Sequence, residues 1–280
     1  MTAIPATTGQ QRWEGWQLEG NSAEAYERYL VPAATSRFAA HLIDLAAPRA
    51  GERVLDVGCG TGIVARSVAP LVGERGAITG IDVNPNMLAV ARRVSAPSRP
   101  AIDWREGDAA ALPFDDANFD VVLCQYAMQF FPDPPAALRE MRRVLAPGGR
   151  VALMLGRSIE HNRVYGLLAD AMARHAGPQA DAMMRSPFPG WTAADLRDLV
   201  SGAGFRDVHV GIHIMTLRYP SAADLLWQEA SYSPLSGDFA TLGADARRAM
   251  AANVTATLAP YTDDDGVTFP IESHTVTARR

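Results

Sequence analysis

The chain has 280 residues, of which 48% are hydrophobic, and its formal net charge is −5. This length and apolar content suit one large α/β domain or a domain with a sizeable appendage. The acidic balance disfavours nucleic acid and anionic membranes as partners, and no run reaches the roughly 18 apolar residues of a membrane helix. The amino-terminal segment lacks the charged and apolar regions of a secretory signal, so we expect a cytoplasmic protein.

Two residue counts narrow the possible chemistry. All 26 basic residues are arginine, which excludes lysine Schiff bases and P-loop or kinase-type lysines. Only two cysteines occur, Cys59 and Cys124, and they are too few for a disulfide framework. We interpret both as small buried side chains without a redox role.

The order of the predicted elements indicates the fold. Residues 1–21 are expected to form a flexible segment, and two helices follow between Ser22 and Ala47, with Pro32 as the break between them. Strands are then predicted at 53–58, 77–82, 101–108, 119–125 and 150–156, with helices at 63–72, 86–94 and 136–145. This alternation predicts an α/β, doubly wound, mainly parallel sheet with helices on both faces.

The remainder of the chain is predicted to be richer in helices. The predicted helices are 161–176, 192–203, 221–232 and 243–259, and the predicted strands are 205–219 and 267–279. We expect a single domain over 22–280, since no linker divides it. Its cofactor-binding core would span about 48–157, and the helical elements on the substrate side would be about 22–47, 158–203 and 220–262.

A glycine-rich loop in VLDVGCGTG, Gly58 to Gly62, joins the first predicted strand to a helix at the sheet edge where ligands bind. Its spacing is G-x-G-x-G rather than the G-x-G-x-x-G of dinucleotide-binding proteins. Asp56, just before the loop, would repel a pyrophosphate but suits a cationic ligand. Asp82 and Asp108 end the next two strands and can accept hydrogen bonds from ribose hydroxyls and an adenine amino group. S-adenosylmethionine fits this set of residues.

Four segments resemble class I S-adenosylmethionine-dependent methyltransferases, most of all the ubiquinone/menaquinone biosynthesis C-methyltransferase-like group. They are VLDVGCGTG (54–62), GIDVNPNML (80–88), EGDAAALPFDDANFDVVLCQYAMQFFPDP (106–134) and EMRRVLAPGGRVAL (140–153). The resemblance implies a Rossmann-like, seven-stranded sheet whose last strand, assigned to 267–279, is antiparallel. It also implies S-adenosylmethionine as cofactor and S-adenosylhomocysteine as product.

The resemblance further implies which residues hold the cofactor. The glycine loop would contact the methionine portion, Asp82 would hold the ribose hydroxyls, and Gln125 would lie near the reacting methyl group. Asp56 would either touch the cofactor or orient the amides of the loop. Val83 and Met87 would flank the adenine, and Asp108 and the amide of Ala109 would read its edge. The full expected set is Asp56, Gly58, Cys59, Gly60, Thr61, Gly62, Asp82, Val83, Met87, Asp108, Ala109 and Gln125.

The sequence assigns no catalytic residue, because methyl transfer from a sulfonium mainly requires positioning of the acceptor. Where a base is needed, the candidates are Tyr126, Gln129, His161 and Tyr165. No metal site is predicted, since His209 and His213 lie on a segment that alternates like a strand and no third ligand is evident. The DPP at 133–135 does not match the signature of amino-directed methyltransferases, because Ala136 rather than an aromatic residue follows it.

Aromatic residues of the amino-terminal segment allow two interpretations. Trp13, Trp16, Tyr26 and Tyr29 either anchor a helix to the core or form a lid whose aromatic face contacts the sulfonium. Of the four, we favour Tyr26 or Tyr29 for the lid.

The predicted function is methyl transfer to oxygen or carbon of a small, largely hydrophobic acceptor, because the segments outside the motifs are rich in methionine and aromatic residues. Three alternatives stay open. The first is an S-adenosylmethionine-binding protein of this fold used for a non-methylating reaction. The second is a nicotinamide-dependent oxidoreductase, against which the glycine spacing counts. The third is a nucleic-acid methyltransferase, which would need a basic groove. The acceptor's identity and the choice between monomer and homodimer also stay open.

Overall fold

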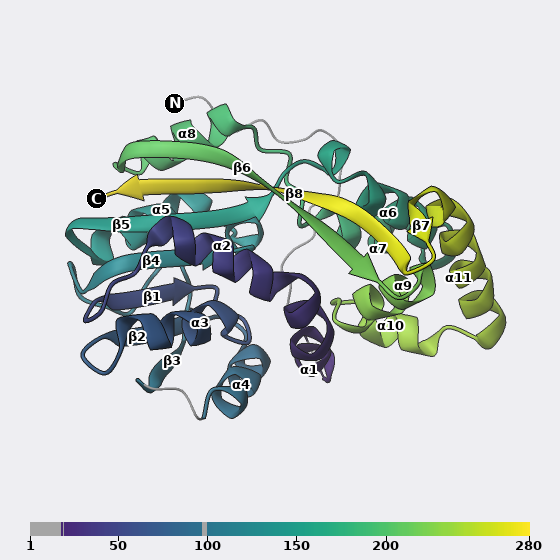
Figure 1. Cartoon of the computed structure of the whole chain (residues 1–280), viewed down its shortest axis with the longest axis horizontal. Coiled ribbons are helices and arrows are strands. Elements are labelled where there is room, and N and C mark those ends of the chain that lie inside the picture. Colours follow the sequence, from purple (N-terminus) through teal and green to yellow (C-terminus); the bar gives the residue numbers. More distant parts are fainter. Residues whose placement is uncertain (1–17, 19, 97–99) are drawn as a thin grey trace.

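In residues 18, 20–96 and 100–280, which the computed structural model describes, eight strands form one sheet with the order β3-β2-β1-β4-β5-β8-β6 and the short β7 beside β8 (Figure 1). The strands are β1 (Arg53–Val57), β2 (Ala77–Asp82), β3 (Ile102–Glu106), β4 (Phe119–Gln125), β5 (Leu145–Gly156), β6 (Arg206–Tyr219), β7 (Thr262–Asp263) and β8 (Gly266–Arg279). β8 runs antiparallel to both of its neighbours, β5 and β6, while the pairs among β1 to β5 are parallel. The predicted mainly parallel sheet with an antiparallel last strand is confirmed.

The sheet separates two hydrophobic cores. Along β1, Val54 packs into one core and Leu55 into the other, and Val121 and Val122 of β4 divide in the same way. This alternation follows from the two-residue period of a strand, which sends successive side chains to opposite faces. Helices α2 (Ser36–Ala46) and α3 (Ile63–Val72) cover the first core, and α5 (Pro134–Val144) and α8 (Ala193–Gly202) cover the second. Strands with both faces covered position the ligand edge rigidly.

The amino-terminal helix runs without interruption from Ser22 to Ala46, so the predicted break at Pro32 is wrong. It consists of α1 (Ser22–Ala25), a π-helical stretch (Tyr26–Thr35) and α2. Pro32 lies inside the π-helical stretch. A wider turn relieves the clash between a proline ring and the carbonyl four residues earlier, so the helix accommodates the proline instead of ending there. Side chains at both ends of the π-helical stretch consequently stay on one rigid element.

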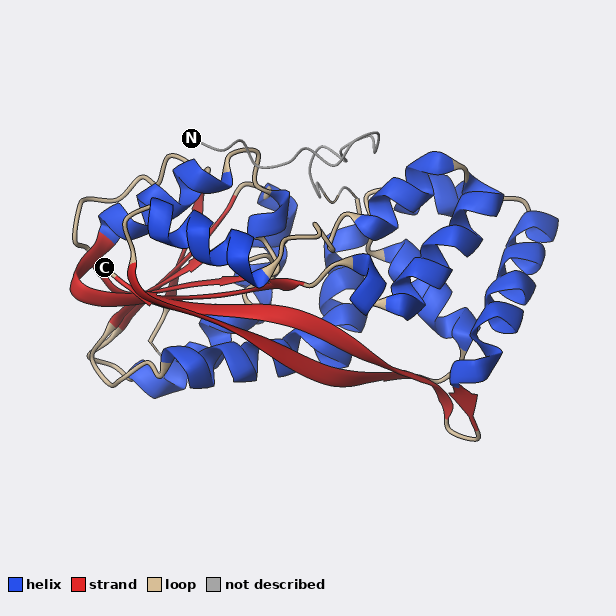
Figure 2. Cartoon of the chain, turned by 90° about the horizontal axis from the view of Figure 1, so that it is seen from above, coloured by secondary structure: helices blue, strands red, loops and turns tan. Residues whose placement is uncertain are grey.

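A second group of helices, here called the helical cap, lies beyond the sheet edge that carries the strand carboxyl ends. It consists of α6 (Arg163–Ala176), α7 (Pro178–Arg185), α9 (Ala222–Ser231), α10 (Ser236–Thr241) and α11 (Ala244–Leu258). α7 and α10 were not expected from the sequence. Figure 2 shows that β6 and β8 extend past the sheet as a twisted ribbon that reaches the helical cap. Many methionine and aromatic side chains of the segments expected on the substrate side, including Met172, Met183 and Phe239, are core residues here.

Within the residues that the structure describes, none of the helices combines the length and the hydropathy that a bilayer crossing requires.

Candidate functional site

The glycine loop lies between the carboxyl end of β1 and the start of α3. The amides of Gly58 and Cys59 both donate to the Ile81 carbonyl, at 2.8 and 3.0 Å, so β2 fixes the start of the loop. Gly60 and Gly62 have φ of +55° and +84°, in the left-handed region that favours glycine. The sequence reasoning therefore located a real backbone turn at the switch point of the sheet, where the order of strands reverses.

Two glycines of this region are required by Trp104 of β3 rather than by a ligand. A Cβ atom at Gly62 would lie 2.1 Å from the Trp104 ring, and one at Gly80 would lie 2.3 Å from it. At Gly60, by contrast, the nearest atom to such a Cβ is the Met87 methyl carbon, 4.0 Å away. The loop consequently has free space beside Gly60, which we call its open side, whereas the Trp104 indole packs against it at Gly62. Sequence reasoning missed Trp104, because this contact joins a residue of β3 to a loop that is far away in the sequence.

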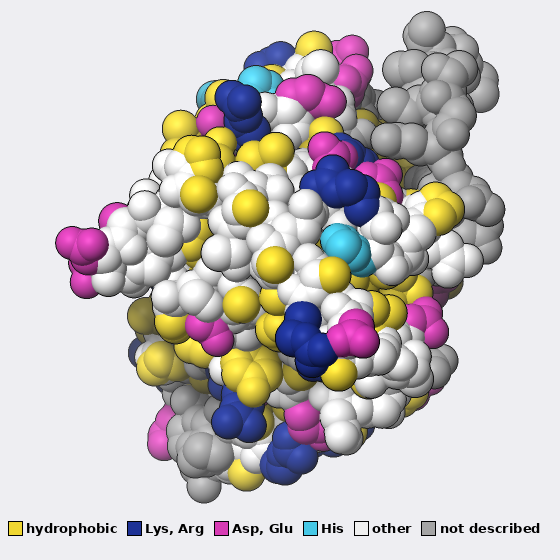
Figure 3. Space-filling model, turned by 90° about the vertical axis from the view of Figure 1, so that its right-hand side faces the viewer, with side chains coloured by type: hydrophobic (Ala, Val, Ile, Leu, Met, Phe, Trp, Pro, Cys, Tyr) yellow, Lys and Arg dark blue, Asp and Glu magenta, His cyan; other side chains and the backbone are white. Residues whose placement is uncertain are grey.

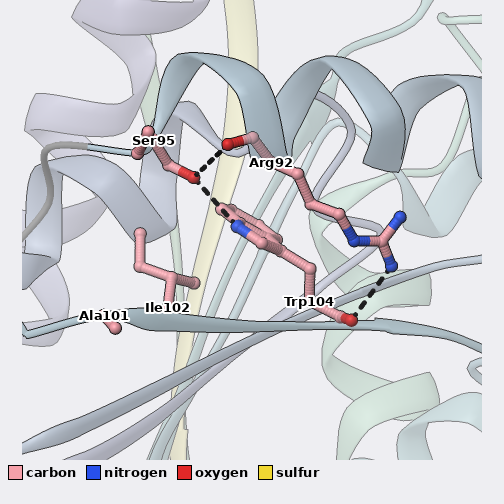
Figure 4. A pocket seen from close by; sticks show the side chains of 6 residues that line it. Arg92, Ser95, Ala101, Ile102 and Trp104 are labelled. Carbon is pink, nitrogen blue, oxygen red and sulfur yellow. Dashed lines mark hydrogen bonds between the residues drawn. The ribbon is translucent and has the colours of Figure 1, made fainter.

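The shallow pocket in Figure 4 lies between β3 and helix α4 (Pro85–Val94), and it is lined by Arg92, Ser95, Ala96, Ala101, Ile102 and Trp104. The Trp104 indole N–H donates to Ser95 Oγ at 3.0 Å, and Arg92 donates to the Trp104 carbonyl at 3.2 Å. These contacts fix the indole that supports the glycine loop. None of the expected cofactor residues lines this pocket, so we assign it no role in binding the cofactor.

Asp82 connects the end of β2 to the open side of the loop. Its Oδ2 accepts from the Gly60 amide at 2.8 Å, and its Oδ1 accepts from the Asn84 amide at 2.9 Å. Burial raises the pKa of Asp82, and these backbone N–H groups oppose that rise. Each carboxylate oxygen keeps a further lone pair after one bond. Asp82 is thus held rigidly and can still accept from two ligand hydroxyls.

Asp56 is buried beneath the loop, with 1% of its surface exposed. Its Oδ2 accepts from the Ala65 amide at 3.1 Å, in the first turn of α3. Burial raises its pKa to about 7, with the Ala65 hydrogen bond opposing the rise and the nearby Asp82 adding to it. Of the two roles left open for Asp56, this contact favours the orientation of backbone amides at the helix start.

The residues expected around the adenine lie just after the ends of β2 and β3 and in the first turn of α4. Met87 is buried and Val83 is 54% exposed, so Val83 offers an uncovered apolar surface beside Asp82. Asp108 is exposed, and its Oδ1 accepts from the Ala110 amide at 2.8 Å, which fixes the turn after β3. Ala109 is buried. The Gly107 amide donates to the Asp82 carbonyl at 3.1 Å, which brings this turn next to Asp82.

Several buried polar atoms around the loop have no hydrogen-bond partner among the described residues. They are Thr61 Oγ1, Gln125 Oε1, Thr35 Oγ1 and both amide atoms of Gln129. Gln125 is otherwise held by its Nε2, which donates to the Thr35 carbonyl at 3.1 Å. Buried polar groups are normally paired, because leaving one unpaired costs roughly 1–3 kcal/mol. The uncommitted atoms together with the open Gly60 fit a polar ligand, and S-adenosylmethionine satisfies that requirement.

The amino-terminal helix lies beside these residues. The Arg66 guanidinium of α3 donates to both Glu27 carboxylate oxygens, at 2.8 and 2.9 Å, and so joins that helix to the element after the glycine loop. Burial is the main cause of the raised pKa of Tyr26, and the carboxylates of Asp82, Glu27 and Asp56 add to the rise. Of the two tyrosines favoured for the lid, Tyr26 is the one whose pKa is affected by Asp82 and Asp56. Tyr29 instead meets the Arg28 guanidinium, and Trp13 and Trp16 lie outside the described residues.

The four candidate bases have different surroundings. Tyr126 follows β4 with φ of +49° and shares a hydrogen bond of 2.6 Å with Ser273 Oγ. His161 is exposed beside Arg157, at 2.9 Å. Gln129 is buried in the turn after β4, and Tyr165 donates to Glu229 at 3.1 Å inside the helical cap. The structure does not bring these four side chains together.

Three further predictions concern residues outside the loop. Cys59 and Cys124 are both free and buried, which agrees with small core side chains. His213 stacks on His41 with ring centroids 3.8 Å apart, and both His209 and His213 lie on β6. Asp133 caps α5 by accepting from the Ala136 amide at 2.9 Å, with the two prolines in the first turn. The DPP segment thus has a structural purpose as a helix start.

Residues 55–153 match the family model described as a methyltransferase domain. The chain is 42% identical over 110 residues to the 2-phytyl-1,4-naphtoquinone methyltransferase of Synechococcus elongatus. The aligned region covers 39% of this chain and 47% of the relative. It is 42% identical over 107 residues to the demethylmenaquinone methyltransferase of Shouchella clausii. This aligned region covers 38% of this chain and 46% of that relative. The chain therefore spans about half the length of these curated relatives.

Solved structures resemble a larger part of the chain. The YcgJ protein of Bacillus subtilis has a TM-score of 0.60 at 18% identity, over 87% of this chain and 98% of that one. Phosphoethanolamine N-methyltransferase 2 of Haemonchus contortus, solved with S-adenosyl-L-methionine, has a TM-score of 0.57 at 20% identity, over 92% and 56%. The [4+2]-cyclase SpnF has a TM-score of 0.55 at 21% identity, over 97% and 87%. At these identities the likeness establishes the fold.

Proposed function

We propose that this chain, which contains a class I S-adenosylmethionine-dependent methyltransferase domain, transfers a methyl group to an oxygen or carbon atom of a small, largely hydrophobic acceptor. The observation that carries the proposal is the arrangement around Gly60. An acid that can accept two ribose hydroxyls lies 2.8 Å from its amide, and Thr61 in the loop and Gln125 at the end of β4 have buried oxygens without partners among the described residues. A nucleoside with a polar cationic tail is the ligand that this arrangement favours.

The chain's own residues would divide the binding of this cofactor. Asp82 would hold the ribose, Met87 and Val83 would flank the adenine, and Gln125 and Thr61 would use their free oxygens near the methionine portion. When bound, S-adenosylmethionine supplies an electrophilic methyl carbon, whose bond to sulfur breaks with the electron pair going to sulfur as the bond to the acceptor forms. The residues at the ends of β4 and β5 would hold the acceptor in line.

The acceptor class is suggested by the relatives and by the surface. The names of the two relatives refer to 2-phytyl-1,4-naphtoquinone and demethylmenaquinone, so a naphthoquinone-type ring is the first class to test. On the face of the helical cap drawn in Figure 3, arginine side chains are scattered among acidic ones and form no continuous basic patch. Together with the net charge of −5, this surface favours a small molecule over a polyanion.

The cofactor is tested by thermal unfolding with S-adenosylmethionine, S-adenosylhomocysteine and NADH in separate titrations. A ligand at about 100 times its Kd adds roughly 2.7 kcal/mol to the free energy of unfolding. We expect both sulfur ligands to raise the unfolding midpoint and Asp82→Ala to abolish the rise, because each lost bond to the carboxylate costs about 1.5–3 kcal/mol. Asp103→Ala, an exposed acid on β3 paired with Arg105, is the matched control. A shift with NADH alone would favour the oxidoreductase instead.

The reaction is tested by measuring S-adenosylhomocysteine formation with 1,4-dihydroxynaphthalene and related hydroxylated rings. Turnover with any of them supports methyl transfer. Binding of S-adenosylmethionine without turnover across the series would favour the second candidate, a protein of this fold with a non-methylating reaction. The structural likeness to the cyclase SpnF is the observation that keeps this candidate in view.

A further inference from the structure

The carboxamide of Gln125, at the end of β4, has one polar atom in use and one free. Its Nε2 donates to the Thr35 carbonyl of the amino-terminal helix at 3.1 Å, whereas its Oε1 is buried and has no hydrogen-bond partner among the described residues. Because a carbonyl oxygen can only accept, the nitrogen must face Thr35, and the orientation of the amide is fixed. Gln125 Oε1 is therefore an acceptor that still needs a donor.

Gln125 lies level with the start of the glycine loop. β1 and β4 are parallel neighbours in which Asp56 is opposite Leu123, so two further residues along each chain bring Gln125 to the level of Gly58. The turn that follows packs directly on the loop, since a Cβ atom at Gly58 would lie 2.3 Å from the Ala127 Cβ. The free oxygen thus belongs to the same sheet edge as the open side of the loop.

The order of the strands indicates which donor can reach this oxygen. Along the sheet the order is β3-β2-β1-β4. Asp82, which would hold the ribose, ends β2, and Gln125 ends β4, on the other side of the glycine loop. The donors of S-adenosylmethionine are the adenine amino group, the ribose hydroxyls and the α-ammonium group. With its adenosine at the ends of β3 and β2, the ligand extends its methionine portion across β1 towards β4, so the α-ammonium group is the donor left for Gln125.

The residue next to Gln125 attaches the same strand end to the amino-terminal helix. Leu123 packs into the first core, which α2 covers, and Cys124 packs into the second. A regular strand would therefore turn Gln125 towards α2 and Tyr126 away from it. Tyr126 instead has φ of +49°, in a region that residues other than glycine rarely adopt, and its ring stacks on Phe38 of α2 with centroids 4.9 Å apart. Two consecutive residues consequently contact one helix.

Tyr126 is also fixed on its other sides. Its amide donates to the Met154 carbonyl of β5 at 2.7 Å, and its hydroxyl shares the bond with Ser273 of β8. A strained backbone persists only where the surrounding structure fixes the residue, and such residues cluster at ligand sites. The end of β4 is therefore held by β5, β8 and the amino-terminal helix together, which gives Gln125 Oε1 a defined position.

We propose that Gln125 binds the α-ammonium group of the cofactor through Oε1 and the amino-terminal helix through Nε2, so that one carboxamide couples cofactor binding to the position of the helix. The ammonium group donates a charge-assisted hydrogen bond to Oε1. This bond strengthens the donation from Nε2 to the Thr35 carbonyl, because hydrogen bonds in a chain polarise one another. The inference rests on the cofactor binding proposed above and adds the chemical group that Gln125 recognises.

The test compares two ligands on the full chain, S-adenosylhomocysteine and deamino-S-adenosylhomocysteine, in which a hydrogen atom replaces the α-ammonium group. Calorimetry gives the Kd of each. We expect the wild type to bind S-adenosylhomocysteine at least about ten-fold more tightly, the effect of one hydrogen bond to a charged group. Gln125→Met should remove most of this preference, and Gln125→Glu should keep it, because a carboxylate still accepts from the ammonium group. Gln179→Met, at an exposed glutamine of α7, is the matched control.

Hydrogen exchange measures the coupling to the helix. At equal occupancy, S-adenosylhomocysteine should slow exchange in 22–46 more than the deaminated ligand does. Gln125→Met should abolish this difference, because the ammonium group then has no carboxamide through which to act on the Thr35 carbonyl.

Other results would overturn the inference. It is wrong if the wild type binds the two ligands equally tightly, or if Gln125→Met weakens both to the same extent, as the loss of a purely structural contact would. Equal protection of 22–46 by the two ligands would exclude the coupling. Failure of the proposed function gives different results. If neither ligand bound, the cofactor assignment and this inference would both be wrong, whereas binding of S-adenosylmethionine without turnover would contradict methyl transfer and leave the preference for the ammonium group intact.

Discussion

Gly60 and Gly62 stand two residues apart in one loop, yet they face different surroundings. Both have positive φ, at +55° and +84°. The space beside Gly62 is filled by the Trp104 ring, whereas the space beside Gly60 is open apart from the Met87 methyl group. At the scale of single residues, a Gly-rich motif therefore combines a position that packs against the protein with a position that is free to face a ligand.

This difference predicts that alanine at Gly62 mainly reduces stability, whereas alanine at Gly60 mainly reduces ligand binding. Gly62→Ala should lower the free energy of unfolding by about 2–5 kcal/mol, since the left-handed backbone costs about 1–2 kcal/mol and overpacking against the indole adds about 1–3 kcal/mol. Gly60→Ala should cost only the backbone part but should weaken S-adenosylmethionine binding, because its Cβ would extend into the open side of the loop. Urea unfolding and ligand titration of both variants check this. Equal losses of stability would contradict it.

At the scale of elements, the continuous amino-terminal helix determines how the loop is covered. The π-helical stretch carries Tyr26 and Glu27 at one end and Thr35, whose carbonyl accepts from Gln125, at the other. Arg66 completes the attachment, because it binds Glu27 and also donates to the Gly62 carbonyl at 3.3 Å. The amino-terminal helix consequently contacts both the helix that follows the glycine loop and the end of β4.

Removal of the Arg66–Glu27 ion pair should make the amino-terminal helix more mobile without unfolding the chain. In Arg66→Ala we expect faster hydrogen exchange in 22–35 and faster dissociation of S-adenosylmethionine. The loss of overall stability should stay within about 1 kcal/mol, because the pair is partly exposed. Exchange mass spectrometry and stopped-flow dissociation give the two readouts, and Arg105→Ala on β3 is the control. An unchanged rate of hydrogen exchange in 22–35 would show that the Arg66–Glu27 pair does not hold the amino-terminal helix in place.

At the scale of the whole molecule, the acids fall into two sets with opposite effects of pH. In the interior, burial raises the pKa of Asp56 and Glu229 to about 7. On the surface, the pKa of Glu52 is lowered by its hydrogen bonds from Arg150, and that of Asp120 by those from Arg53. The first set costs stability where it is ionised in the folded chain, and the second set stabilises the fold.

The two sets predict opposite pH profiles of stability. Between pH 4 and pH 7 folded Asp56 holds a proton that the unfolded chain has lost, so its contribution to the free energy of unfolding falls as pH rises towards about 7. Asp56→Asn should therefore gain stability relative to the wild type across this range, by at most about 4 kcal/mol. Glu52→Gln should instead be destabilised at pH 7, and its difference should vanish as pH falls through the lowered pKa of Glu52. Urea unfolding at each pH measures the free energy of unfolding of both variants and the wild type. If the difference between Asp56→Asn and the wild type did not depend on pH, the raised pKa of Asp56 would be wrong.

The sequence by itself determined the alternating strands and helices, the loop Gly58–Gly62 with acids near the strand ends, and the strand at 267–279, because burial period and turn chemistry are local properties of a chain. The structure confirms the sheet and its antiparallel strand. Only the tertiary structure decided that the helix continues through Pro32, that Trp104 supports Gly62, and that Gln125 and Tyr126 both contact the amino-terminal helix. These features depend on which surfaces pack together across long sequence separations, and a single sequence carries no local signal for such contacts.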